Sequence, residues 1–207
     1  MQLILVILII YHILLSTCNL SQHERKFLYF AYGSNLLDRR MRINSPSAVF
    51  IMPAKLPHYR LDFDKYSANW RGAVATIAED FQSDVWGAIW AVDNREIAAL
   101  DGQEGVHRGL YYPKYVKVLT PEGHEVSART YQLINNPPMV SSENLPPERR
   151  PSNTYLQVIA LGAYQCGIPA HYIGYLYTFP TNGQISVVSL RKQLGYPFNT
   201  TTVQNMK

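Results

Sequence analysis

The sequence has few cysteines and none of the spacings that bind metal ions. Its 207 residues include two cysteines, Cys18 and Cys166, which are too few for a disulfide scaffold and are not spaced as metal ligands. The histidines stand far apart, with no H-x-x-x-H pattern that would place two ligands on one face. We therefore expect neither a disulfide framework nor a bound metal.

Charge is also scarce, and its distribution excludes another class of partner. Charged residues make up 16% of the chain, against roughly 25% in an average soluble protein. There are 19 Lys and Arg residues and 15 Asp and Glu residues, a net charge of +4, but no basic tract that could follow a phosphate backbone. We expect no nucleic-acid partner. The G-x-S-x-G turn of a serine nucleophile is likewise absent.

Apolar and aromatic residues are abundant. Hydrophobic residues make up 47% of the chain, and 15 residues are tyrosines. This composition excludes a disordered or coiled-coil chain. The length fits one domain with a well-filled core.

An apolar run from residue 3 to residue 15 opens the chain, and Ser16, Thr17 and Cys18 then provide small residues typical of a cleavage site. We predict that residues 1–18 are a signal peptide and that the protein is secreted. The alternative is an uncleaved anchor, the one route to a membrane partner, although about thirteen residues are short of the ~20 that a span needs. After export, Asn199 in an N-T-T sequon could accept a glycan.

Short β-branched or aromatic segments, separated by Pro, Gly, Asn or Asp, predict strands through most of the chain. These segments are 27–32, 48–51, 59–63, 73–77, 85–90, 115–119 and 126–134. The turn sequence Pro121-Glu122-Gly123 joins the last two as a hairpin. We expect a largely antiparallel sheet that curls toward a barrel.

Two helices can be placed by their end signals. Asp93 as the N-cap, with Glu96 three residues later, predicts a capping box and a short helix from Asn94 to about Leu100. A longer helix begins after Pro151, capped by Ser152 or Asn153, and stops before Gly167.

The surroundings of the longer helix give further expectations. Its apolar face includes Cys166, which we interpret as a buried core thiol. The Pro-rich loop before it, residues 136–151, is long enough to predict that it lies over a site. Residues 184–194 suggest one more strand or short helix.

Two segments have the residue types of a reaction site. At Tyr32-Gly33-Ser34-Asn35 a strand runs through a glycine into a helix start, where free backbone N–H groups suit a carboxylate or a developing oxyanion. Glu104 lies in a glycine-bounded turn at the end of the first helix and could act as a general base in a partly apolar pocket. Each pattern also occurs in ordinary turns.

Together these segments resemble the γ-glutamylcyclotransferase family. The resemblance covers about residues 27–172 and rests on FLYFAYGSNLL (27–37) and LDGQEGV (100–106), with shorter matches between and after them. It implies an α+β fold with a small mixed, mostly antiparallel β-barrel and flanking helices, in a domain of residues 25–180. Residues 181–207 depart from the family pattern and form a C-terminal extension.

The resemblance also implies a reaction: cyclisation of γ-glutamyl amino acids to 5-oxoproline and a free amino acid, with no metal or organic cofactor. It leaves open a preference for γ-glutamylamines or glutathione, a secreted binder without turnover, and a homodimer. Glu104 matches the family's general acid/base. The substrate-binding positions that the resemblance implies are Tyr29, Phe30, Ala31, Tyr32, Gly33, Ser34 and Tyr155.

Overall fold

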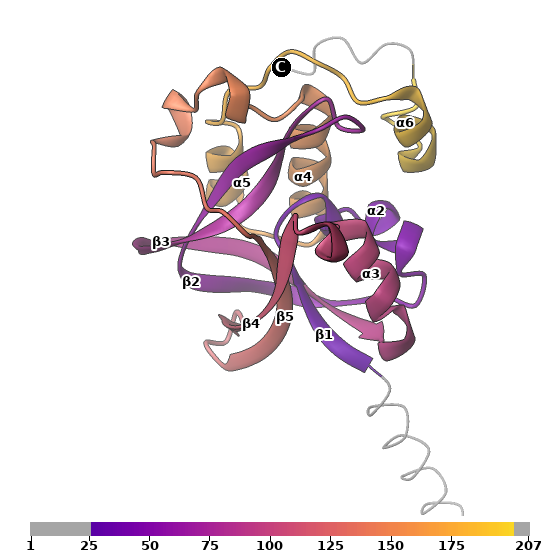
Figure 1. Ribbon diagram of the computed structural model, residues 1–207. Coiled ribbons are helices and arrows are strands. Elements are labelled where there is room, and N and C mark those ends of the chain that lie inside the picture. The colour runs from indigo at the N-terminus through magenta and orange to yellow at the C-terminus, as the bar shows by residue number, and fades with distance from the viewer. Residues whose placement is uncertain (1–25, 201–207) are drawn as a thin grey trace, which may run out of the picture.

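The computed structural model describes residues 26–200, so the leader predicted for residues 1–18 lies outside the described residues. Five strands form a closed barrel in the order β1-β3-β2-β4-β5 (Figure 1). Neighbouring strands are antiparallel except β1 and β5, which are parallel. The predicted α+β class with a mixed, mostly antiparallel barrel is confirmed. The strands are β1 (Lys26–Ala31), β2 (Val49–Ser67), β3 (Gly72–Asp93), β4 (Tyr111–Leu119) and β5 (Glu125–Leu133).

The expectation of separate short strands before residue 93 was wrong. Segments 48–51 and 59–63 belong to the single strand β2, and segments 73–77 and 85–90 belong to β3. The prolines that suggested breaks lie within β2. Pro53 pairs with Ala88, and one of the register shifts of the pair lies between Pro57 and Tyr59. The far ends of β2 and β3 therefore extend beyond the barrel as a long hairpin (Figure 1).

Helix α3 (Ile97–Glu104) continues a 3-10 turn, Asn94–Glu96, that starts at the predicted cap. The Asp93 side chain accepts a 2.9 Å hydrogen bond from the Arg95 N–H. The capping box itself was wrong, because Glu96 bonds to the Ser47 hydroxyl, 2.7 Å away, and not to Asp93. The helix runs one turn past Leu100 to Glu104 and ends at Gly105, whose φ is +67°, within the glycine-bounded turn where its end was expected.

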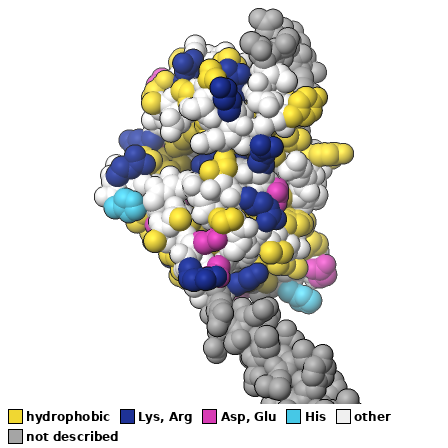
Figure 2. Space-filling view, turned by 90° about the vertical axis from the view of Figure 1, so that its right-hand side faces the viewer, with side chains coloured by type: hydrophobic (Ala, Val, Ile, Leu, Met, Phe, Trp, Pro, Cys, Tyr) yellow, Lys and Arg dark blue, Asp and Glu magenta, His cyan; other side chains and the backbone are white. Residues whose placement is uncertain are grey.

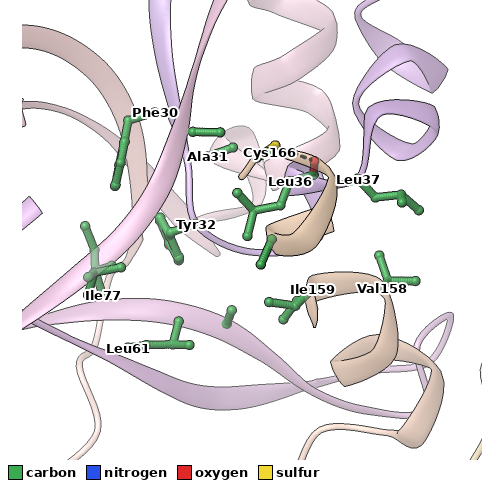
Figure 3. Close-up of a cluster of buried hydrophobic side chains, with 14 of the residues drawn as sticks. Phe30, Ala31, Tyr32, Leu36, Leu37, Leu61, Ile77, Val158, Ile159 and Cys166 are labelled. Atoms are coloured by element: carbon green, nitrogen blue, oxygen red, sulfur yellow. Dashed lines mark hydrogen bonds between the residues drawn. The ribbon is translucent and has the colours of Figure 1, made fainter. Parts of the chain in front are cut away.

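Helix α4 (Asn153–Gln165) has the predicted cap, since the Ser152 hydroxyl accepts from the Tyr155 N–H at 3.2 Å. It packs against the chain that follows β1. The buried Cys166 thiol donates to the Leu36 carbonyl at 3.3 Å (Figure 3), and burial raises its pKa to about 12. The prediction of an inert core thiol is confirmed.

The remaining helices lie outside the barrel, near α3 and α4 and above or beside the strands in the view of Figure 1. The sequence indicated the helical turns after Ser34 and a helix or strand within 184–194, but not α5. Residues 181–200 pack on the domain: the Val187 N–H donates to the Asn69 carbonyl at 3.0 Å, and Phe198 is buried. These elements are a 3-10 turn (Ser34–Leu36), α2 (Asp38–Asn44), α5 (Ala170–Leu176) and α6 (Val188–Leu194).

The surface gives two further observations. Lys and Arg side chains are dispersed over the face in Figure 2 and form no continuous stripe. Within residues 26–200, every helix is too short or too polar to cross a membrane.

Close packing of α4 on the turn after β1 depends on Gly162. A Cβ at Gly162 would lie 2.3 Å from the Leu37 nitrogen and 2.5 Å from the Leu36 carbonyl carbon. Gly162→Ala should therefore lower the free energy of unfolding by about 1–3 kcal/mol, as overpacked cores do. Urea unfolding measures the change.

Gly174→Ala is the matched control. Gly174 is also helical, but a Cβ there would meet nothing within 4 Å. The alanine should stabilise α5 by about 0.5–1 kcal/mol through its better helix propensity. If both substitutions change stability equally, α4 is not held tightly against Leu36 and Leu37.

Candidate active site

A cavity of about 350 Å³ opens where α3, α4 and the β2–β3 hairpin meet. Its walls combine polar and apolar side chains from segments that are distant in sequence. An inner pocket of about 30 Å³, room for about one water, lies beside it and is surrounded by tyrosines. Both spaces share four residues, which therefore mark their junction: Ser34, Glu104, Tyr111 and Tyr155.

Glu104, the last residue of α3, places its carboxylate at this junction. Its Oε1 accepts hydrogen bonds from Asn35 Nδ2 at 3.1 Å and from Gln103 Nε2 at 2.9 Å. Helix α3 is tied to β5 nearby, because Asp101 accepts from the Arg129 guanidinium at 2.7 Å and from the Tyr131 hydroxyl. The general base predicted from the sequence is thus held at a fixed place in a cavity.

The side-chain amides of Asn35 and Gln103 form hydrogen bonds through both their NH₂ groups and their oxygens, and these bonds fix the orientation of each amide. Gln103 Nε2 also donates to Asn35 Oδ1 at 3.0 Å, and Asn35 Nδ2 also donates to the Tyr29 hydroxyl at 3.1 Å. Gln103 Oε1 accepts from Arg40 at 2.8 Å and from Asn44 at 2.7 Å. Since that oxygen already holds two donors, the Gln103 amide must turn its N–H₂ group toward Glu104. We call these bonds the amide network.

Burial raises the pKa of Glu104 above its ordinary value. The hydrogen bond from Gln103, the positive charge of Arg40 and the hydrogen bond from Asn35 each lower it and offset part of this effect. Burial in turn lowers the pKa of Arg40, although Glu104 opposes that change. A carboxylate with a raised pKa lies closer to the range in which a general base works at neutral pH.

The loop at Gly33 supplies free backbone donors next to this carboxylate. Gly33 has φ −110°, so its backbone is not left-handed, and a Cβ there would make only ordinary contacts with Ala75 Cβ at 3.4 Å and the Tyr155 hydroxyl at 3.5 Å. Among the described residues, no backbone carbonyl accepts from the N–H groups of Gly33, Ser34 or Asn35 at the helix start. These groups can receive a negative oxygen.

The predicted substrate loop is divided between the pocket and the core. Tyr29 and Tyr32 line the inner pocket with Gly33 and Ser34. The side chains of Phe30 and Ala31 are fully buried in the core, because alternate residues of a strand face opposite sides and both sides of β1 are covered here (Figure 3). Only their backbone could contact a ligand.

Tyr155 reaches the junction from α4, as predicted. Its hydroxyl accepts from the Ala75 N–H at 3.1 Å, while the Tyr111 hydroxyl donates to the Ala75 carbonyl at 2.6 Å. Burial raises the pKa of Tyr155 to about 12, so the phenol stays protonated at neutral pH. Its ring packs on Trp70, with centroids 4.6 Å apart.

The expectation that the Pro-rich loop covers the site was wrong. None of residues 136–151 lines the cavity in the described part of the chain; residues 65–70 of the β2–β3 hairpin do. Arg149 holds the loop away from the cavity, because its guanidinium bonds to the Asp62 carboxylate and to the Phe63 carbonyl.

Several site residues were not identified from the sequence. Asn35 and Gln103 lie inside the two sequence motifs, but no role was predicted for their side chains. Arg40 lies one helical turn beyond the first motif, where a surface charge is the ordinary interpretation. The other lining residues that sequence reasoning missed are Lys65, Trp70, Arg108 and Tyr111.

No three His, Cys, Asp or Glu side chains come together as metal ligands within residues 26–200. The donors around Glu104 are two amides and a guanidinium, which bind a carboxylate and not a cation.

Comparison with known proteins agrees with this site. The AIG2-like family model matches residues 84–176. The chain is 43% identical to γ-glutamylcyclotransferase of Bos taurus over 73% of its length and 78% of that protein, and 39% identical to that of Homo sapiens over 80% and 85%. A solved structure of a γ-glutamyl cyclotransferase superposes with a TM-score of 0.73 at 34% identity, covering 82% of this chain and 98% of that one. The chain belongs to the γ-glutamylcyclotransferase family, as the sequence motifs indicated.

The raised pKa of Glu104 predicts a pH-dependent stability. A carboxyl group whose pKa is higher in the folded state costs no stability well below its unfolded pKa of about 4.3. The cost grows as the pH rises from the unfolded to the folded pKa and is complete above the folded pKa. Glu104→Gln should therefore raise the melting temperature at pH 7, and the gain should vanish as the pH falls below about 4. Thermal unfolding across this pH range measures it.

Glu122→Gln is the control with the opposite sign. Glu122 is exposed, and a hydrogen bond with Thr120 lowers its pKa, so its neutral replacement should not stabilise the protein at pH 7. If Glu104→Gln changes the melting temperature equally at every pH, its effect comes from packing and not from ionisation.

Proposed function

We propose that this protein is a γ-glutamylcyclotransferase that converts γ-glutamyl amino acids into 5-oxoproline and the free amino acid. The observation that carries the proposal is the partly buried Glu104 carboxylate, held by Asn35 and Gln103 where the inner pocket meets the cavity. The curated relatives of the same name, which match most of the chain, support this activity.

The chemistry needs one base and no covalent intermediate. Glu104 removes a proton from the α-ammonium of the substrate, and the free amine attacks the γ-carbonyl carbon of its own chain. A new C–N bond closes the five-membered lactam, and the original γ-amide C–N bond breaks. The protonated Glu104 gives its proton to the leaving nitrogen as that bond breaks. The second proton of the attacking nitrogen then passes through the same carboxylate to the released amine, so that the lactam is neutral, the amino acid leaves as its ammonium form and Glu104 is again ionised.

The loop after β1 is suited to the charge that develops during this step. As the amine adds, the γ-carbonyl oxygen becomes negative and needs donors. Within residues 26–200 the N–H groups of Gly33, Ser34 and Asn35 have no backbone acceptor, and these residues line the inner pocket with Glu104. Loss of one such donor typically costs ~3 kcal/mol of transition-state stabilisation.

The rest of the rate enhancement comes from holding the substrate folded. Nucleophile and electrophile belong to one molecule, and well-oriented intramolecular reactions gain on the order of 7–11 kcal/mol. The tyrosines of the inner pocket are positioned by backbone contacts, such as those of Tyr111 and Tyr155 with Ala75, so the walls are rigid before substrate arrives. Arg40 lines the cavity, and its buried Nε has no hydrogen-bond partner in the described part of the chain, so its guanidinium is the group suited to the glutamyl α-carboxylate.

Two alternatives bear on this proposal. A preference for γ-glutamylamines or glutathione would keep the same chemistry, and rates on a panel of these substrates decide it. A binder without turnover is not supported, because the curated relatives are named as γ-glutamylcyclotransferases and the carboxylate is retained in the pocket.

Replacement of Glu104 tests the chemistry. Glu104→Gln keeps the shape of the side chain but removes the base, so release of 5-oxoproline from a γ-glutamyl dipeptide should fall at least about a hundredfold. Chromatographic quantification of 5-oxoproline measures it, with the melting temperature as a check on folding. A rate within tenfold of the wild type would exclude Glu104 as the base.

We also propose that residues 1–18 are removed as a signal peptide and that the protein is secreted. The support is the apolar run and the small residues that follow it. Expression in eukaryotic cells should release the protein into the culture medium, with an N-terminus near Asn19 when read by Edman sequencing. Recovery of full-length protein in the membrane fraction would favour the uncleaved anchor. A homodimer stays a proposal that light scattering can test.

A further inference from the structure

Arg108 is a free cation at the mouth of the cavity. It lies four residues after Glu104, in a 3-10 turn (Val106–Arg108) between two glycines with positive φ, Gly105 and Gly109. The side chain is exposed and lines the cavity. Within the described residues its guanidinium has neither a hydrogen bond nor an ion pair.

The position of the guanidinium depends on Gly105. A Cβ at Gly105 would lie 2.9 Å from Arg108 Nη2 and 3.2 Å from Nε, so the guanidinium packs directly against this glycine. Gly105 also has a left-handed backbone, with φ +67°, which other residues rarely adopt. The turn therefore holds the guanidinium against Gly105, the residue after Glu104, in the wall of the cavity that Glu104 also lines, and no described residue occupies its donors.

The charges that line the cavity do not balance. Three cationic side chains, Arg40, Lys65 and Arg108, face one anionic side chain, Glu104. Arg40 already donates to Gln103, and Lys65 has Asp64 at 3.9 Å. A γ-glutamyl amino acid has two carboxylates, one on the glutamyl half and one on the amino acid that leaves. The excess positive charge suits such a dianion.

The two cations that flank Glu104 lie at different depths. Arg40 is mostly buried, with its Nε in the interior, whereas Arg108 is exposed. The glutamyl half must lie at Glu104, where its amine is deprotonated, and the leaving half must face the open cavity through which it departs. The carboxylate nearest Arg108 is therefore that of the leaving amino acid.

We infer that Arg108 binds the carboxylate of the leaving amino acid and so makes the enzyme select α-amino acids over simple amines as leaving groups. This inference rests on the proposed function. The planar guanidinium can hold a carboxylate with two parallel hydrogen bonds. The positive charge of Lys65 is partly neutralised by Asp64, 3.9 Å away.

The test compares two substrates that differ in one group. γ-Glutamyl-alanine and γ-glutamyl-ethylamine share the same skeleton, with the carboxylate of the first replaced by hydrogen in the second. Arg108→Ala should lower kcat/KM for γ-glutamyl-alanine about tenfold to hundredfold, the effect of one lost charged hydrogen-bonded pair, mainly through KM. It should leave γ-glutamyl-ethylamine within twofold. Arg108→Lys should recover part of the loss, because it keeps the charge.

Arg42→Ala is the matched control, because Arg42 is an exposed arginine that pairs with Asp38 and does not line the cavity. It should leave the ratio of the two substrates unchanged. Equal loss on both substrates in Arg108→Ala, or loss on neither, would overturn the inference while the proposed function stands. If the wild type forms 5-oxoproline from neither substrate, the proposed function fails and this inference with it.

Discussion

The site depends on the burial of one carboxylate. An ionised carboxyl group taken out of water is strongly destabilising unless donors surround it. Here Asn35 and Gln103 supply those donors to Glu104, and Gln103 is itself oriented by Arg40 and Asn44. The amide network thus joins the turn after β1, helix α2 and the end of α3. None of these elements can shift without breaking a bond that keeps the carboxylate satisfied.

The barrel and α4 hold this network in place from outside. The Cys166 thiol and the Gly162 backbone bring α4 against Leu36, directly after Asn35 (Figure 3). On the opposite side, Asp101 fastens α3 to Arg129 of β5, three residues before Glu104. The two ends of the network are therefore anchored to different elements, one to helix α4 and the other to strand β5 of the barrel. This rigidity suits a reaction in which the enzyme's main task is to hold a flexible chain folded.

Local signals in the sequence predicted the helix caps and the two segments of the site more accurately than they predicted the strands around them. Ser152 and Asp93 cap their helices as expected, and Glu104 and the loop at Gly33 meet in one pocket. These features depend on residues a few positions apart. The strand segments predicted a sheet that curls toward a barrel, but not the lengths of β2 and β3, because long strands with register shifts look like several short ones. The partners of Glu104 were missed because Arg40 comes to it only through the folding of α2 onto α3.

The cations near Glu104 have separate consequences. Arg40 lowers the pKa that burial raises, so the carboxyl group is moved part of the way back toward its ordinary value. Arg108 has no partner among residues 26–200 and contributes to the field at the mouth instead. Four of the site residues lie within one stretch of six positions, 103–108: Gln103, whose amide binds the carboxylate, the base Glu104, the left-handed Gly105 and Arg108. A change in this turn would therefore alter proton transfer and leaving-group choice together, whereas a change at Arg108 alone would alter only the second.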